Sequence, residues 1–300
     1  MTQTQMVSET DALAHPSVSE GAVGRGGIRG FLSIPEGAIG AGLAVVLVLV
    51  IVIGPYVAPY DPEALVAIPG LGPSSAHWLG TDPLGRDVFS RVLAGGRLVL
   101  LLPVIAIAIA ITVGATVGLL AGYLGGVFDL VVARVIDVVL ALPSFLLVLV
   151  IIAAFGAGDA NVVAAVAIVY TPGIARVIRG ATQAIRPREF VLAARARGDS
   201  IPWIVFREIA PNISATLLVE TAMRLTLSIL FIASLNFLGL GVQPPTPDWG
   251  VMVSENREIM FSHVLPVLVP ALAIAMLAIS VNLLADALTR YFGDDVGSAA

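Results

Sequence analysis

Residues 98–123 read LVLLLPVIAIAIAITVGATVGLLAGY, a long run without a charged side chain. About 20 apolar residues in a helix are enough to cross the hydrocarbon core of a bilayer, which is about 30 Å thick. The run therefore predicts a transmembrane helix. In and just after it, glycine recurs every four residues, at Gly114, Gly118, Gly122 and Gly126. Small residues at this spacing predict a face on which a second helix packs closely.

The rest of the chain has the same apolar character. Of its 300 residues, 58% are hydrophobic and only 12% are charged, whereas soluble domains carry about 25% charged residues. Five further stretches are apolar and long enough to span a membrane, at about 38–58, 132–156, 161–180, 213–238 and 264–288. The sequence therefore predicts an all-α membrane protein with a bundle of six transmembrane helices.

Polar segments lie beyond and between these helices. The first of them is rich in Gly and Ser and lacks the apolar region of a signal peptide, so we expect a disordered cytoplasmic tail. The expected organisation is a tail at 1–30, a membrane domain at 31–292 and a second tail at 293–300. Within the membrane domain we expect outer loops at 59–97 and 239–263 and an inner loop at 181–212.

The arginines orient the bundle. An even number of helices puts both termini on one side, and arginines gather on the cytoplasmic side of membrane proteins. All 16 basic residues are arginine. Arg224 lies within a predicted helix. If both termini are cytoplasmic, eleven of the other arginines lie on the inner side, and the outer segments hold only Arg86, Arg91, Arg97 and Arg257. This bias predicts a multi-pass protein of the bacterial cytoplasmic membrane with both termini inside.

Composition also excludes several kinds of chemistry. There is no cysteine and no lysine, so thiol catalysis and a lysine-containing phosphate-binding loop are excluded. The histidines, His15, His77 and His263, fall in the tail and the outer loops, so we expect neither a histidine-based nucleophile nor a metal site within the membrane. The chain is therefore expected to be no enzyme, and any nucleotide that drives it would bind to another chain.

The inner loop contains the stretch EFVLAARARGDSIPWIVFREIAPN at 189–212. Its first part predicts a short helix with Phe190, Ala193, Ala194 and Arg197 on one face. Gly198 is suited to end that helix, and WIVFREIA predicts a second helix that ends at Pro211. The result is a helical hairpin beside the membrane. From spacing alone, its arginines fit anionic lipid as well as a protein partner.

This hairpin resembles the cytoplasmic signature loop of bacterial ABC-importer permeases, in which two alanines, a glycine and a later proline recur at fixed intervals. Ala193, Ala194, Gly198 and Pro211 match that pattern. The sequence departs from it where Leu192 replaces an acidic residue, and where Glu208 and Ala210 replace apolar residues. Glu189 supplies an acid three residues earlier, in a form that resembles the peptide-importer branch.

Three other stretches resemble the second permease subunit of dipeptide, oligopeptide and nickel importers. They are HWLGTDPLGRDVFSRVLAGGR at 77–97, SLNFLGLGVQPPTPDWG at 234–250 and NLLADALTRYF at 282–292. The resemblance implies the type I ABC importer fold and a non-catalytic transport subunit that moves peptides inward by alternating access. Importers of nickel, haem and glutathione share these motifs and stay as alternatives.

The resemblance also implies partners. They are a homologous permease subunit in a heterodimer, two cytoplasmic ATPase domains, an extracytoplasmic substrate-binding protein and membrane lipid, without nucleic acid. No cofactor is expected in this chain, because ATP and Mg would bind to the partner ATPase. The ATPase would be contacted by the hairpin, for which the expected coupling residues are Glu189, Ala193, Ala194, Arg195, Arg197, Gly198 and Pro211.

The outer loops carry a second set of candidate residues. Asp82, Arg86, Asp87 and Arg91 are expected to form a local ion-pair network, with Asp87 and Arg91 paired one helical turn apart. The network either staples the loop or contacts the binding protein. Trp249, in the proline-rich QPPTPDWG, is suited either to anchor the chain at the membrane–water boundary or to form part of a rigid outer cap.

Charges within the membrane are the third set, because they are costly unless paired. Glu220 and Arg224 lie one turn apart, and either fix the helix against its neighbours or line the path and meet the termini of a peptide. Asp137 has Arg134 nearby. Further along the same helix, Ser228, Ser234 and Asn236 either line a polar track or form hydrogen bonds between helices. A competing hypothesis is a secondary transporter with Glu220 or Asp137 as proton site, but the sequence shows no inverted repeat to support it.

Overall fold

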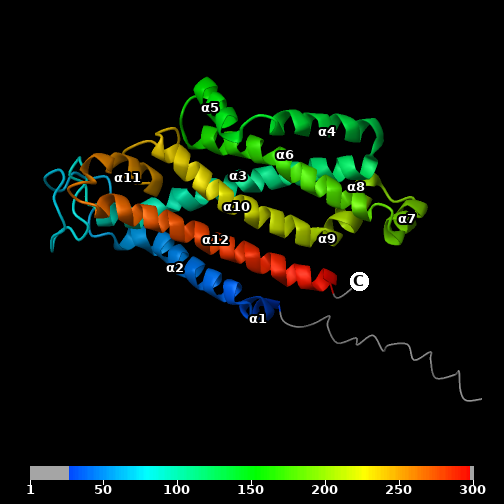
Figure 1. The fold of residues 1–300 in the computed structure, drawn as a ribbon, viewed down its shortest axis with the longest axis horizontal. Helices are drawn as coiled ribbons and strands as arrows, with labels where there is room; N and C mark the ends of the chain where they lie inside the picture. Colours follow the sequence, from blue (N-terminus) through cyan, green and yellow to red (C-terminus); the bar gives the residue numbers. More distant parts are fainter. Residues whose placement is uncertain (1–26, 298–300) are drawn as a thin grey trace, which may run out of the picture.

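The computed structural model describes residues 27–297 as a long helical bundle (Figure 1). The helices are α1 (Gly27–Leu32), α2 (Pro35–Val57), α3 (Val88–Leu124), α4 (Gly126–Leu140), α5 (Ser144–Phe155), α6 (Asp159–Ile185), α7 (Glu189–Ala196), α8 (Ile201–Trp203), α9 (Ala210–Asn212), α10 (Ser214–Phe237), α11 (Trp249–Glu255) and α12 (Leu265–Gly297). A π-helical turn, Ile204–Ile209, joins α8 to α9, and a 3₁₀ turn, Arg257–Ile259, follows α11.

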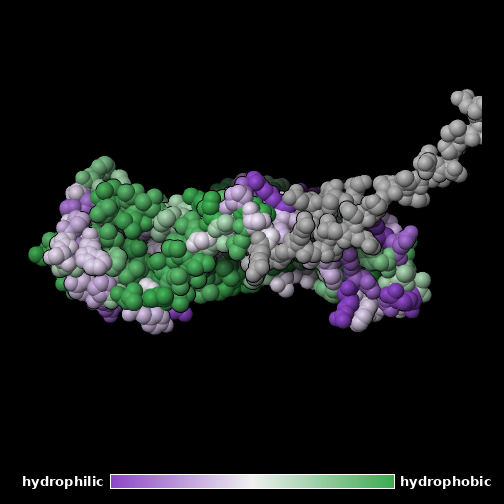
Figure 2. Space-filling model, turned by 90° about the horizontal axis from the view of Figure 1, so that it is seen from below, coloured by the Kyte–Doolittle hydropathy of each residue, from purple (hydrophilic) through white to green (hydrophobic). Residues whose placement is uncertain are grey.

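The membrane-spanning part agrees with the predicted fold class. In the described chain α2, α3, α6, α10 and α12 are each long and apolar enough to cross a bilayer, and α4 with α5 forms a bent pair that is either one further, broken span or a re-entrant loop. Figure 2 shows a broad apolar surface on the bundle, with hydrophilic residues gathered toward its ends. The all-α membrane bundle is therefore confirmed.

The third expected helix, 132–156, is wrong as a single element. The chain there forms α4 and α5, which are bent by 87° relative to each other. The break falls at Pro143, which has no N–H to donate and which disfavours helical geometry at the residue before it. Figure 1 shows α4 lying along α6 and α5 turning away from the direction of α4; Val148 and Ile152 of α5 pack in one buried cluster with Val162 of α6.

The glycine stripe of α3 is packed against α6. A Cβ atom added at Gly114 would lie 2.9 Å from the Thr171 carbonyl oxygen, and one at Gly118 would lie 2.6 Å from that of Ala175. At Gly122 the carbonyl oxygen of Arg179 would be 2.7 Å away. These three glycines therefore allow the close approach that the sequence predicts. Gly126 does not share this role, because nothing lies within 4 Å of its Cβ position.

The two ends of the bundle carry different structures. The loop between α2 and α3 lies with α11 at one end, and α7 lies at the other end, toward which the end of α12 also points (Figure 1). The expected outer loop 59–97 is shorter than predicted, because residues 88–97 already belong to α3. That helix has 37 residues, so it is about 55 Å long and extends beyond a hydrocarbon core of about 30 Å.

The two predicted tails are only partly described. Most of the 1–30 tail lies outside the described residues, as does the end of the 293–300 tail. Where the structure describes them, both are helical: Gly27 begins α1, and α12 extends to Gly297. The helical part of the chain therefore begins earlier and ends later than the sequence predicts.

Candidate functional site

The hairpin that follows α6 is built around a glycine turn. Arg188 precedes α7 with extended backbone, and Gly198 follows it with φ at +80°. Most residues avoid this left-handed region because of their Cβ atom, whereas glycine adopts it freely. The second arm then runs from Ile201 through the π-helical turn to Asn212. Pro211 therefore lies inside a helical turn, and the predicted helix end at Pro211 is wrong by one residue.

The residues that α7 buries against the rest of the hairpin differ from the face predicted from the sequence. Val191 and Ala194 are fully buried and belong to one apolar cluster with Ile204 and Val205 of the second arm. Ala194 therefore packs within the hairpin itself and does not share an exposed face with Ala193, while its expected part in coupling stays a prediction. The residues that remain exposed on α7 and its turn are Glu189, Leu192, Ala193, Arg195, Ala196, Arg197 and Gly198.

Two arginines fix the hairpin. Arg197 donates to Asp199 at 2.7 Å and to Glu208 of the second arm at 3.1 Å, and the hydrogen bond to Asp199 raises the pKa of Arg197. Arg195 donates from Nε to the Tyr123 hydroxyl at 3.1 Å, and its guanidinium carbon lies 4.6 Å from the centre of that ring. Tyr123 is near the end of α3, so Arg195 joins the hairpin to α3, the longest helix in residues 27–297. No motif or spacing in the sequence points to Tyr123.

At the opposite end, a buried ion-pair cluster joins the outer loop to α11. Arg86 Nε lies 2.5 Å from Asp82 Oδ2, and Arg86 Nη2 lies 2.9 Å from Glu255 Oε2. Arg91 Nη2 lies 3.0 Å from the same Glu255 oxygen and also donates to the carbonyl oxygens of Pro62 and Pro245. We call Asp82, Arg86, Arg91 and Glu255 the outer cluster. Sequence reasoning missed Glu255, because it is far away in the chain.

Asp87 does not pair with Arg91 as predicted. It caps the start of α3, where Oδ2 accepts from the backbone N–H and the hydroxyl of Ser90 at 2.8 and 2.7 Å. Its other oxygen lies 2.8 Å from His77 Nδ1. The cap satisfies an N–H group that a helix start otherwise leaves unpaired. The helix cap and His77 therefore use the carboxylate that the i,i+4 rule assigned to Arg91.

Burial separates the two roles considered for these residues. Asp82, Arg86, Asp87 and Arg91 are each 2% exposed or less, so they present no surface to a second protein in this conformation. The geometry favours the stapling role. Trp249 is likewise 1% exposed, and its Nε1 donates to the Val92 carbonyl oxygen of α3 at 2.8 Å. It locks α11 onto α3, so its interpretation as an anchor at the membrane boundary is wrong.

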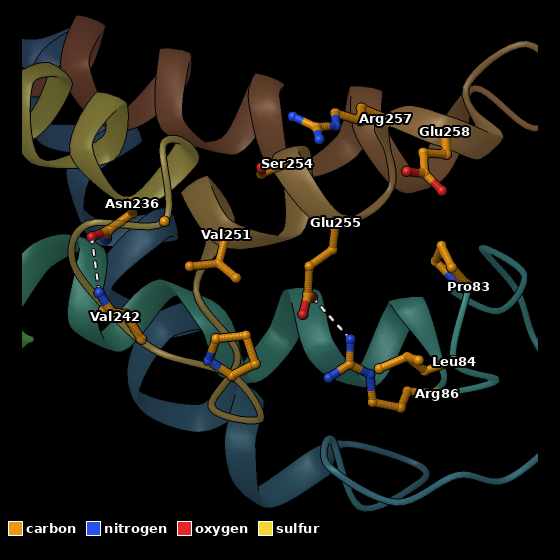
Figure 3. Close-up of a pocket in the computed structure, with 12 residues that line it drawn as sticks. Pro83, Leu84, Arg86, Asn236, Val242, Val251, Ser254, Glu255, Arg257 and Glu258 are labelled. Carbon is orange, nitrogen blue, oxygen red and sulfur yellow. Dashed lines mark hydrogen bonds and ion pairs between the residues drawn. The ribbon is translucent and has the colours of Figure 1, made fainter. Parts of the chain in front are cut away.

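A cavity of ≈ 390 Å³ opens beside the outer cluster. Figure 3 shows Glu255 reaching Arg86 across one wall, and Asn236 accepting from the Val242 N–H at another. Arg257 and Glu258 lie at the edge of the cavity, both exposed and without an ion-pair partner in the described chain. Asn236, expected in a polar track along α10, instead holds the loop that follows that helix.

Asp248 is a further buried acid that the sequence did not single out. It caps α11, accepting from the N–H groups of Gly250 and Val251. Removal from water raises the pKa of Asp248 from its ordinary 3.8 to about 6, although these N–H groups and the Asn236 amide oppose the effect. Burial disfavours the charged carboxylate, so the folded state binds this proton more tightly than the unfolded state does.

This acid predicts a pH dependence of stability. Because the folded pKa is raised, the contribution of Asp248 to stability should fall as pH rises from about 4 to about 6, by about 3 kcal/mol in total, and stay constant above. Thermal unfolding in detergent should show this fall, and Asp248→Asn should remove it. Asp61→Asn, which neutralises an exposed acid of the first outer loop, is the control. Equal pH profiles for wild type and Asp248→Asn would contradict the assignment.

Within the membrane, Glu220 and Arg224 form the predicted pair. Arg224 Nε lies 2.7 Å from Glu220 Oε1, and the guanidinium lies beside Tyr170 of α6, 5.9 Å from the ring centre. Ser228 and Ser234 donate to the carbonyl oxygens of Leu225 and Leu230 in their own helix. Their place in a polar track therefore stays a prediction.

A second set of charges joins α4 to α6. Asp137 lies 3.9 Å from Arg134, the predicted partner, but also bonds more closely to Arg176. Asp129 bonds to Arg179 in the same way, one turn farther along α6. Both acids are thus held by arginines of the neighbouring helix, and neither is left free as an isolated proton site.

Comparison with known sequences identifies the chain. Residues 114–297 match the family described as binding-protein-dependent transport system inner membrane component. The glutathione transport system permease protein GsiD of Pectobacterium atrosepticum is 42% identical over 254 residues, which cover 84% of each chain. Proteins of the same name in Shigella flexneri and Salmonella paratyphi A are each 44% identical, over 84% and 83% of each chain. The chain belongs to this permease family.

Membership of the family assigns the general function. The permease is the multi-pass inner-membrane subunit of an ABC-type importer of the dipeptide, oligopeptide and nickel branch, and it has the type I importer fold. A permease of this kind is a transport subunit that works with an ATPase and a binding protein. The hairpin, the outer cluster and the intramembrane pair are thus three regions of one transport subunit.

Proposed function

We propose that this permease imports small peptides, and that glutathione is the first substrate to test. The relatives reported above are named for glutathione transport, and glutathione is itself a tripeptide. Di- and oligopeptides belong to the same chemical class, with free amino and carboxyl groups on a short amide chain. Nickel and haem, which have other chemistries, serve as the alternatives in the test.

The hairpin carries the proposal for how transport is driven. Its inner face is buried against this chain and joined to α3 through Arg195 and Tyr123. Its outer face leaves Glu189, Leu192 and Ala193 exposed, and a cavity of ≈ 680 Å³ opens beside it, lined in part by Arg188, Glu189 and Phe190. The hairpin is packed against this chain on one face and exposed on the other. Such a surface is suited to bind a partner protein and to transmit the partner's motion to the membrane helices.

The rest of the assembly follows from this role. A homologous permease completes the pore as a heterodimer, two ATPase domains seat on the hairpins from the cytoplasm, and the binding protein delivers substrate from outside. ATP and Mg bind to the ATPase partners, because this chain has no lysine for a phosphate-binding loop. We place both termini in the cytoplasm. The end of α12 points toward the same end of the bundle as α7, which supports this placement for the C-terminal helix (Figure 1).

The test uses the complete transporter in proteoliposomes, with its binding protein and labelled glutathione or a labelled dipeptide. We expect uptake that requires ATP inside a catalytically competent ATPase and that excess unlabelled peptide, but not nickel or haem, reduces. A matched complex with an inactive ATPase is the control. Uptake driven by a proton gradient in that control would overturn the importer mechanism, and competition by nickel or haem alone would overturn the substrate class.

A further inference from the structure

The guanidinium of Arg224 has one edge in use and one edge free. Its Nε donates to Glu220 at 2.7 Å. Nη1 and Nη2 have no acceptor within residues 27–297, and neither is among the fully buried polar atoms of that range. The five donors of a guanidinium lie in one plane, so a side chain engaged through Nε still presents the paired Nη edge to a second carboxylate. Glu220 therefore positions the guanidinium but leaves its two Nη groups free to bind another acceptor.

The neighbouring helix α6 makes room for this edge. A Cβ atom at Gly173 would lie 3.0 Å from Arg224 Nη2 and 3.3 Å from Nη1, so glycine lets the guanidinium lie directly against the backbone of α6. Tyr170, one turn earlier, flanks the same group with its ring, and its hydroxyl has no hydrogen-bond partner in the described chain. A fork of two N–H donors and a phenol are thus gathered at one place on α6 and α10.

This place lies deep within the membrane. Arg224 is near the middle of the 24-residue helix α10, and the helix rises about 1.5 Å per residue, so the guanidinium is near the bilayer midplane. Its side chain is 26% exposed. Arginine facing hydrocarbon at this depth is strongly disfavoured, and intramembrane charges face the interior of a bundle or a water-filled path. The exposed part of Arg224 is therefore expected to face the interior of the assembled transporter and not lipid.

We propose that the Nη edge of Arg224 receives the free carboxylate of the peptide as it crosses the membrane. The proposal rests on the proposed function, because it assumes a peptide cargo. Glu220 has a definite part in it: by neutralising most of the local charge, it keeps the fork from binding an anion tightly. A site on a transport path has to bind its cargo well enough to admit it and weakly enough to release it.

The experiment compares a dipeptide with uncharged side chains and its C-terminal amide, which lacks the carboxylate. The complete transporter in proteoliposomes takes up each at saturating binding protein, and the ratio of acid uptake to amide uptake is measured. The binding protein is the same for every permease variant, so its own preference cancels when variants are compared with wild type. We expect Arg224→Lys and Arg224→Gln to lower the ratio by about tenfold, the worth of one charge-assisted hydrogen bond.

Glu220→Gln is the matched control, since it breaks the same pair from the other side. It leaves the fork without its competing anion, so we expect the ratio to rise above that of wild type. If the pair only fixed the helices, the two substitutions would lower acid and amide uptake alike and leave the ratio unchanged, which would overturn the proposal. Absence of uptake of either peptide by the wild-type complex would instead count against the proposed function.

Discussion

Replacing Glu255 by alanine will destabilise the permease by about 3 kcal/mol or more, because removal of one partner of a buried ion pair leaves an uncompensated charge. Glu255 Oε2 accepts from both Arg86 and Arg91. Asp82 would still lie 2.5 Å from Arg86, but it is farther from Arg91, at 3.7 Å. The fully buried Arg91 therefore loses its closest carboxylate. Thermal unfolding in detergent measures the loss, and ATP-driven uptake should fall with it.

Glu258→Ala provides the control for this variant. Glu258 lies three residues further along, is exposed and has no ion-pair partner in the part of the chain that the structure describes. Its substitution should change stability by less than about 0.5 kcal/mol, as is usual for surface positions. If Glu255→Ala and Glu258→Ala unfold at the same temperature, the outer cluster does not hold the loop and α11 together.

Gly198→Val will abolish most transport while the permease still inserts in the membrane. Gly198 has φ at +80°, and nothing lies within 4 Å of its Cβ position, so crowding is no obstacle to a larger side chain. The obstacle is the backbone, because a β-branched residue at positive φ is strained by about 1–3 kcal/mol. The turn will therefore open and displace α7, and we expect ATP-driven uptake to fall by about 5- to 150-fold, since about 1.4 kcal/mol corresponds to tenfold.

Gly198→Asn is the control that distinguishes an effect of backbone strain from an effect of side-chain size. Asparagine adopts the left-handed region more readily than other residues that carry a Cβ atom, so its uptake should stay close to that of wild type. Membrane content of each variant is measured by immunoblot, and ATP hydrolysis by the complex is measured beside uptake. Equal uptake by the valine and asparagine variants would show that the geometry of the turn is not required for coupling.

The sequence predicted the membrane helices well because their signal is local. Composition and run length located the spans, and the spacing of Gly114, Gly118 and Gly122 predicted the close face that α3 presents to α6. A kink or interruption at Pro143 is expected from the same reasoning. The continuous apolar run on both sides did not reveal that the chain divides there into two helices at a steep angle.

The sites were predicted less well because their contacts are not local. Arg86 and Arg91 meet Glu255 across 169 and 164 residues, a pairing that no periodicity reveals. The local rule instead assigned Arg91 to Asp87, whose carboxylate the helix cap takes. In α7, alanines on several sides left the buried face undetermined, and the second arm decided it by packing Ile204 and Val205 against Val191 and Ala194.

Helix α3 gives the permease a mechanical property that follows from its length alone. Its outer end carries Arg91 of the outer cluster, and its inner end carries Tyr123, which holds Arg195 of the hairpin. A continuous rod of about 55 Å moves its far end by about 1 Å for each degree of tilt. One continuous helix therefore connects the structures at the two faces of the membrane, so that a tilt at one face displaces residues at the other. Pro103 lies within this helix and is the position at which it is expected to bend most easily.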